Sequence, residues 1–158
     1  MKLSQKYDTS GLIEDQFEPG SRGRVLKNLL RIKKKREMDA VEAVEHSRVL
    51  PEILGKYSMV HRFTAKDICD IHKAWFGSIY PWAGQYRKVN ISKGGFPFAA
   101  AKYVPGMMHE LENDFLSKFT PCRFAKIEDI ANAIAVVHVE LVLIHPFRKG
   151  NGRSILRP

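Results

Sequence analysis

Long apolar runs are missing from this chain. No stretch of about twenty consecutive apolar residues occurs, so the sequence predicts no membrane-spanning helix. Met1 to Lys6 carries charge with no apolar stretch after it, unlike a secretory signal. Internal repeats and low-complexity segments are absent as well. The sequence therefore predicts a globular cytoplasmic protein, and it does not exclude an effector that a secretion system exports.

Cysteine is scarce, with two residues in the chain, Cys69 and Cys122. They lie far apart and have none of the short spacings that metal-binding cysteines show. In a cytosolic protein such cysteines are typically buried thiols, and this is our expectation for both.

Acidic residues are fewer than basic ones, 17 against 26, which gives a formal net charge of +9. Much of the excess lies in one cluster: Arg31, Lys33, Lys34, Lys35 and Arg36. We interpret the cluster as a solvated helix edge or turn. The alternatives are a surface that attracts acidic partners and one that binds nucleic acid.

Apolar spacing predicts a mainly α-helical single domain over residues 1–158, a length that suits one core. Residues 1–22 read as an irregular leader. Two of the predicted helices start near Arg24 and at Thr64. Three others cover 37–50, 104–119 and 127–144, and Pro51 marks the end of the helix over 37–50. Because 127–144 is apolar nearly all round, we expect it to be the central buried helix.

Among the histidines on predicted helices ahead of the chain's last motif, His72 and His138 are the candidates for a functional role. His72 falls on an apolar face and is expected to be a hydrogen-bonded core residue. His138 and His145 are two turns apart, whereas helical zinc pairs usually stand four residues apart with other ligands nearby. The sequence therefore predicts no metal ligand, and a buried hydrogen bond for His138 that steadies the motif.

A hairpin is predicted over residues 86–99. Gln85 to Ser92 alternates apolar and polar residues, Lys93-Gly94-Gly95 is a turn signal, and 96–99 forms the return strand. Pro97 restricts the return strand to a sheet edge. Such an edge can recruit an extended peptide through main-chain hydrogen bonds. The alternative is a structural hairpin without a partner.

The most informative stretch runs from Ile144 to Arg153. His145 leaves the apolar helix at Pro146, and its imidazole can take a proton near neutrality. The Gly-Asn-Gly turn at 150–152 can bring main-chain N–H groups close to an anion. Arg148 and Arg153 offer guanidinium forks that suit phosphate oxygens. These residue types together predict a phosphate-binding turn beside a general base.

The same stretch resembles the signature of the Fic family, which reads H-P-F-x-(D/E)-G-N-G-R-x-x-R. The matching residues are His145, Pro146, Phe147, Gly150, Asn151, Gly152 and Arg153. The resemblance implies a Fic-type helical bundle with a short β-hairpin flap and a motif loop over 145–153. It also implies a protein adenylyltransferase, which moves AMP from ATP to a Ser, Thr or Tyr hydroxyl of a target protein.

The resemblance assigns roles by position. His145 would be the base, while Gly150, Asn151, Gly152 and Arg153 would hold the nucleotide phosphates. Pro146 and Phe147 would shape the loop. The flap that registers the target would comprise Ile91, Ser92, Lys93, Gly94, Gly95 and Phe96.

Two positions depart from the family pattern. Lys149 stands where the family has an acid that helps to hold Mg²⁺, and Leu156 replaces the second arginine. ATP is the expected cofactor, but an ammonium cannot coordinate a cation, so Mg²⁺ is doubtful. Lys149 could instead contact phosphate, turnover could be slow, or the domain could be inactive. Because few residues follow Arg153, the sequence also reads as truncated.

Regulation and competing functions stay open at this stage. Residues 10–15 match only the first part of the family's inhibitory helix, and its glutamate would be Glu14. A separate antitoxin protein is an equally compatible inhibitor. The competing functions are a related phosphotransfer reaction and a non-catalytic Fic-fold module that binds a partner protein or nucleic acid.

Overall fold

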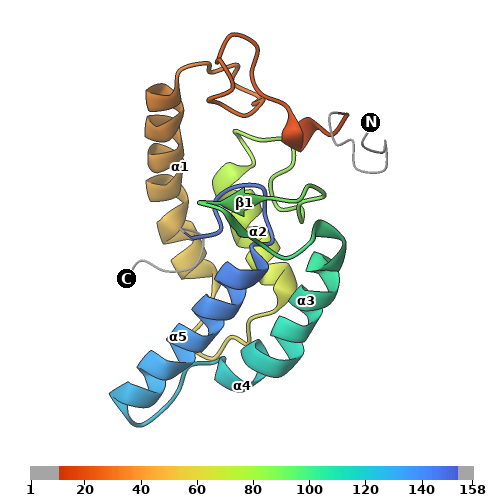
Figure 1. Ribbon diagram of the computed structural model, residues 1–158. Coiled ribbons are helices and arrows are strands. Elements are labelled where there is room, and N and C mark those ends of the chain that lie inside the picture. Colours follow the sequence, from red (N-terminus) through yellow and green to blue (C-terminus); the bar gives the residue numbers. More distant parts are fainter. Residues whose placement is uncertain (1–10, 153–158) are drawn as a thin grey trace, which may run out of the picture.

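The computed structural model describes residues 11–152 as a mainly helical fold with one small hairpin (Figure 1). Its α-helices are α1 (Lys35–Lys56), α2 (Ala65–Phe76), α3 (Val104–Glu110), α4 (Ser117–Phe119) and α5 (Ile127–Ile144). The π-helical turn η4 (Leu111–Leu116) joins α3 to α4, so the helix predicted over 104–119 is present with a π-helical middle. In Figure 1, α1 and the α3–α4 rod flank α2 and α5. The predicted fold class is confirmed.

Helix α2 begins at a complete capping box. The Thr64 hydroxyl accepts a hydrogen bond from the Asp67 N–H at 3.2 Å, and the Asp67 carboxylate accepts one from the Thr64 N–H at 2.9 Å. Two N–H groups of the first turn are thereby satisfied. This local chemistry fixes where α2 starts, and α2 in turn carries His72 and Phe76 toward the motif loop.

The helix predicted near Arg24 is not formed. The side chain of Asn28 accepts a hydrogen bond from the Ile32 N–H at 2.9 Å and donates to the carbonyls of Leu26 and Ile32, each at 3.0 Å. An asparagine that bonds nearby main chain in this way holds a turn in place of a helix. The apolar pattern there reflects turn residues that reach the core, and the first α-helix starts at Lys35.

Helix α1 runs through Pro51, contrary to the predicted boundary. Proline inside a helix costs about 3 kcal/mol. Val49 is buried on one side of Pro51 and Ile53 packs against the same core on the other. The burial of these side chains outweighs the missing hydrogen bond and keeps α1 helical to Lys56.

The hairpin is shorter than its sequence pattern predicts. Strand β1 (Ser92–Lys93) pairs antiparallel with β2 (Phe96–Pro97), around glycines 94 and 95, which both have positive φ. Residues 85–90 form no strand because their N–H groups bond elsewhere. The Arg87 N–H reaches the carbonyl of Pro146 at 2.8 Å, and the Lys88 N–H reaches the Glu14 carboxylate at 2.7 Å. The hairpin turn itself lies where the sequence predicts it.

Helix α5 covers the predicted range but is not buried all round. One face packs on η4, α3 and α4. Its other apolar side chains are open to solvent, with Ile127 at 70% and Val139 at 52% exposure. The expectation of a central buried helix is therefore wrong for residues 11–152, because within this range helices cover only one side of α5.

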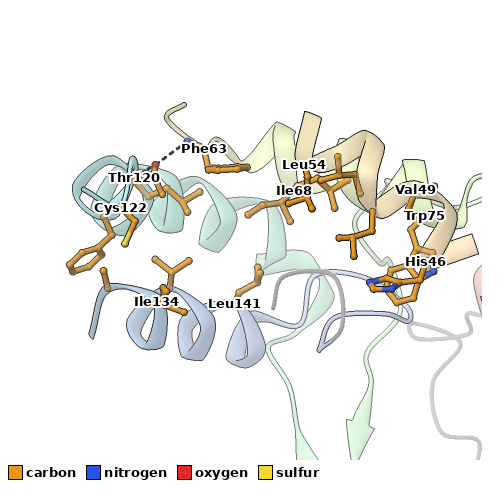
Figure 2. Close-up of a pocket in the computed structure, with 17 residues that line it drawn as sticks. His46, Val49, Leu54, Phe63, Ile68, Trp75, Thr120, Cys122, Ile134 and Leu141 are labelled. Carbon is orange, nitrogen blue, oxygen red and sulfur yellow. Dashed lines mark hydrogen bonds between the residues drawn. The ribbon is translucent and has the colours of Figure 1, made fainter. Parts of the chain in front are cut away.

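An apolar groove lies between α1 and α2 on one side and α5 on the other (Figure 2). Its volume is about 350 Å³. Val49, Leu54 and Ile68 face Ile134 and Leu141 across it. Cys122 also lines the groove and is exposed, and Cys69 is partly buried, so the expectation of two buried thiols is wrong.

The basic cluster forms part of a shallow hollow with the preceding turn. Its cationic side chains are Arg22, Arg24, Lys33, Lys34, Lys35 and Arg36. All are exposed, and the one acidic group that lines the hollow, Asp39, pairs with Lys35. Between Gly11 and Gly152, no helix combines the length and apolar character that a membrane crossing needs.

Candidate active site

His145 ends α5 in a left-handed backbone conformation, with φ 51°. Its Nδ1 lies 3.2 Å from the carbonyl oxygen of Val142. A carbonyl only accepts, so Nδ1 carries the proton and Nε2 of the neutral ring keeps its lone pair. Partial burial lowers the pKa of His145 below its ordinary value. The imidazole is thus neutral near pH 7, with one nitrogen available as a base.

Phe98, just after β2, stacks on the imidazole of His145. The ring centroids are 3.7 Å apart and the planes differ by 15°. This contact and the Val142 carbonyl hold the ring from two sides. The stack also joins the hairpin to His145, so the hairpin lies next to the imidazole. The sequence places Phe98 in the return strand of the hairpin but does not predict its contact with His145, because 47 positions separate the two residues.

Arg87 joins the hairpin to the end of α5. Its side chain is 1% exposed and donates to four main-chain carbonyls: His145 at 2.7 Å, Val89 at 2.8 Å, Ala99, and Ile144 at 3.2 Å. Two of these carbonyls lie at the C-terminal end of α5, where a cation is favourable. Burial lowers the pKa of the guanidinium. The sequence did not predict these contacts, because arginine is seldom buried and the carbonyls of Ile144 and His145 lie 57 and 58 positions away.

The motif loop is closed by Asn151. Its side chain accepts a hydrogen bond from the Phe147 N–H at 2.7 Å and donates to the Phe147 carbonyl at 2.8 Å. The asparagine is buried and its amide is bonded on both sides to Phe147, so its side chain shapes the loop. Phe147 is fully buried and stacks on His72, with ring centroids 3.9 Å apart.

Gly150 is required by its surroundings. It has φ +88°, and a Cβ placed there would lie 2.4 Å from Cε2 of Phe76. We expect Gly150→Ala to lower the free energy of unfolding by about 2 kcal/mol, from strain and overpacking together. Gly152→Ala is the matched control, because within residues 11–152 no atom beyond its own chain neighbours lies within 4 Å of its Cβ position. Denaturant unfolding measures both variants, and equal stabilities would contradict the prediction.

His72 is a fully buried histidine with both ring nitrogens bonded, as the sequence analysis expected. Nδ1 accepts from the Gly84 N–H at 2.9 Å, so Nε2 donates to the carbonyl of Lys149, also at 2.9 Å. Burial lowers the pKa of His72 to about 4. The neutral ring therefore fastens α2 to the motif loop.

This low pKa predicts a pH dependence of stability. Between pH 6.5 and about 4 the unfolded chain binds a proton at His72 that the folded chain does not. As the pH is lowered through this window, the free energy of unfolding should fall by up to about 3 kcal/mol and then level off. In His72→Gln, compared by urea unfolding at several pH values, this part of the fall should vanish. Exposed His109→Gln is the control, and identical pH profiles for all three proteins would refute the assignment.

Lys149 forms a partly buried ion pair with α1. Its Nζ lies 2.6 Å from Oε1 of Glu42, whose side chain is 3% exposed. The same oxygen accepts a hydrogen bond from the Tyr80 hydroxyl at 2.7 Å. Sequence reasoning did not connect Glu42 with the motif, because 107 positions separate the two partners and no local pattern relates them.

Arg148 turns toward the leader and away from the predicted phosphate site. Its Nε donates to the carbonyl of Glu14 at 2.9 Å, and its Nη2 lies 3.8 Å from the Asp15 carboxylate. Glu14 sits in a three-residue 3₁₀ turn and accepts from the Lys88 N–H. Residues 11–15, which match the family's inhibitory helix only in part, therefore form no α-helix here. Ser10, Arg153 and Leu156 lie outside the described residues.

The hydrogen bond predicted for His138 is missing. Its Nδ1 is buried and has no partner among residues 11–152. His138 and His145 are not part of any group of three or more metal-ligating side chains in the described chain. At the family's metal-binding position the side chain is the Lys149 ammonium, already paired with Glu42. The donor set around the loop does not fit Mg²⁺.

A mainly helical domain whose histidine loop adjoins a short exposed hairpin has the features of a Fic domain. The Fic/DOC family model matches residues 62–156. Because this match covers more than half of the chain, the protein belongs to the Fic/DOC family.

Two relatives carry an activity in their names. Protein adenylyltransferase VbhT from Bartonella schoenbuchensis is 30% identical over 151 residues, which is 96% of this chain and 30% of VbhT. Protein adenylyltransferase Fic from Drosophila virilis is 30% identical over 128 residues, covering 74% of this chain and 24% of that protein. The chain thus spans less than a third of the length of either relative.

Solved structures agree on the fold. The N-terminal Fic domain of a Bartonella effector protein from Bartonella sp. AR 15-3 superimposes with a TM-score of 0.77 at 22% identity, covering 91% of this chain and 69% of that one. A Fic domain from Bartonella quintana with bound ADP gives a TM-score of 0.65 at 26% identity, over 81% of this chain and 66% of that one.

Proposed function

We propose that this chain is a protein adenylyltransferase that moves AMP from ATP to the hydroxyl of a Ser, Thr or Tyr in a target protein. The observation that carries the proposal is the state of His145. Its Nδ1–H is held by the Val142 carbonyl, and Nε2 keeps a lone pair, in a ring that adjoins the motif loop and stacks on Phe98 of the hairpin. Relatives named as adenylyltransferases and a neighbour with bound ADP support the choice of reaction.

In the proposed reaction the target hydroxyl oxygen attacks the α-phosphorus of ATP. The hydroxyl proton passes to Nε2 of His145 as the new P–O bond forms. The bond from the α-phosphorus to the bridging oxygen breaks, and pyrophosphate leaves. A base placed in this way contributes about 10²–10⁴-fold to the rate.

The phosphates would rest on the turn at Gly150, Asn151 and Gly152, with Arg153 on the distal phosphates. Gly150 brings the main chain close, and the Asn151 side chain holds the turn closed before a nucleotide binds. Such preorganised groups need no rearrangement in the transition state. Lys149 is a further candidate at this site. No step is assigned to Mg²⁺, which the residues present do not fit.

The target would bind along the hairpin. Ser92, Lys93, Gly94, Gly95 and Phe96 are exposed, and Ile91 is partly buried at the hairpin's base. An extended segment of the target can add to this edge through main-chain hydrogen bonds, which places its hydroxyl near His145. A separate antitoxin protein that covers the site is the proposed means of inhibition.

Intact-mass spectrometry tests the function. The chain is incubated with ATP and a panel of candidate target proteins, and we expect one of them to gain the mass of one AMP. A gain of phosphate alone would point to a related phosphotransfer reaction. No gain on any protein, together with salt-sensitive binding of RNA to the basic hollow, would contradict the enzyme and favour a binding module.

A further inference from the structure

We propose that Lys149, held in place by Glu42 of α1, supplies positive charge to the nucleotide phosphates, so that this chain binds nucleotide without a divalent cation. The proposal deepens the proposed function, and it rests on that function for the identity of the ligand. Its ligand is a metal-free nucleoside di- or triphosphate.

Glu42 is fixed before any ligand arrives. Its carboxylate is buried, and Oε1 takes both the Tyr80 hydroxyl at 2.7 Å and the Lys149 ammonium at 2.6 Å. Its main-chain carbonyl accepts from Nε1 of Trp75 at 2.9 Å. A buried carboxylate needs a cation nearby, and among residues 11–152 Glu42 has its ion pair with Lys149. Core residues Tyr80 and Trp75 thus hold Glu42 in place, and Glu42 in turn holds Lys149.

Lys149 is placed to act on an anion at the loop. It directly precedes the turn at 150–152, and its carbonyl is held by His72 at 2.9 Å. An ammonium has three N–H donors, and Glu42 accepts from one of them. The side chain remains 31% exposed, so part of the ammonium's surface can meet a phosphate oxygen. The Glu42 contact holds the long side chain in one place, which reduces the entropy lost when a ligand binds.

The same arrangement disfavours a metal ion. Magnesium binds through oxygen ligands such as carboxylates, and this position carries a cation instead. The carboxylate paired with this ammonium, Glu42, already binds both Lys149 and Tyr80 through Oε1. A divalent ion at the loop would meet the repulsion of Lys149, and among residues 11–152 no group of three or more metal-ligating side chains compensates for it. The Lys149 ammonium thus supplies part of the positive charge that a bound metal ion would otherwise place next to the phosphates.

Calorimetric titration with a non-hydrolysable ATP analogue, in EDTA and in Mg²⁺, tests the proposal. For the wild type we expect the two Kd values to agree within about twofold, because protein charge and not metal sets the affinity. In the double variant Glu42→Gln/Lys149→Glu, which offers a carboxylate and no resident ammonium, we expect Mg²⁺ to tighten binding by about tenfold. Wild-type binding that needs Mg²⁺ would overturn this proposal and leave the proposed function standing.

A second variant separates charge from folding. Lys149→Met alone would leave the buried Glu42 carboxylate without a counter-ion. The double variant Glu42→Gln/Lys149→Met removes both charges and is therefore the better choice. Its affinity in EDTA should fall by about tenfold, the value of one phosphate contact. The exposed Lys118→Met is the control. Wild-type affinity in the double variant would also overturn the proposal, and no nucleotide binding by the wild type in either buffer would contradict both the proposal and the function.

Discussion

His145→Asn should lower the rate of AMP transfer by about 10²–10⁴-fold, the range for the loss of a positioned base. Asparagine is chosen because residue 145 has φ 51°, a conformation that asparagine tolerates better than most residues. The fold should therefore survive, and thermal unfolding monitored by circular dichroism would verify this. Transfer is measured as the rate at which target protein gains the mass of AMP.

His138→Asn is the matched control for this experiment. His138 lies on the same helix and makes no hydrogen bond within residues 11–152, so transfer by this variant should match the wild type. Because burial lowers the pKa of His145, the acid limb of the wild-type kcat/KM profile should fall below pH 6.5. Equal loss in both variants would contradict the assignment of His145 as the base, and so would an acid limb well above pH 6.5.

Arg87→Met should lower the free energy of unfolding by about 4 kcal/mol, because several buried carbonyls lose their donor at once and each costs about 1–3 kcal/mol. Among the carbonyls affected are those of Ile144 and His145 on the motif side and Val89 on the hairpin side. Arg87→Lys should recover only part of the loss, since an ammonium cannot reproduce the planar fork. Urea unfolding measures both variants.

Arg123→Met is the matched control for Arg87, because Arg123 is exposed and should change stability by less than about 0.5 kcal/mol. If Arg87→Met were as stable as this control, the contacts of Arg87 would not hold the hairpin to α5. A hydrogen-exchange measurement adds a local readout: in Arg87→Lys, protection should fall at residues 89–99 more than in α1.

Local chemistry explains where the sequence predicted structure well. Thr64 and Asp67 start α2 through contacts three residues apart, and the pair Gly94–Gly95 supplies the positive φ that the hairpin turn needs. The apolar pattern of 127–144 likewise matches α5. The helix predicted near Arg24 failed because Asn28 bonds nearby main chain, and two other predictions failed because of contacts with distant segments. Residues 85–90 form no strand because main-chain N–H groups there bond Pro146 and Glu14. Helix α1 continues through Pro51 because residues on both sides of this proline pack in the core.

By itself, then, the sequence determined the family, the helical class, the hairpin turn and the place of His145, because each depends on residues close together along the chain. Only the tertiary structure decided which partner each motif side chain takes. Lys149 pairs with Glu42, Arg148 turns to the leader, and Arg87 holds the end of α5. These contacts join segments far apart in sequence. Which charged and hydrogen-bonding groups meet there depends on how the elements pack, and local residue spacing does not specify it.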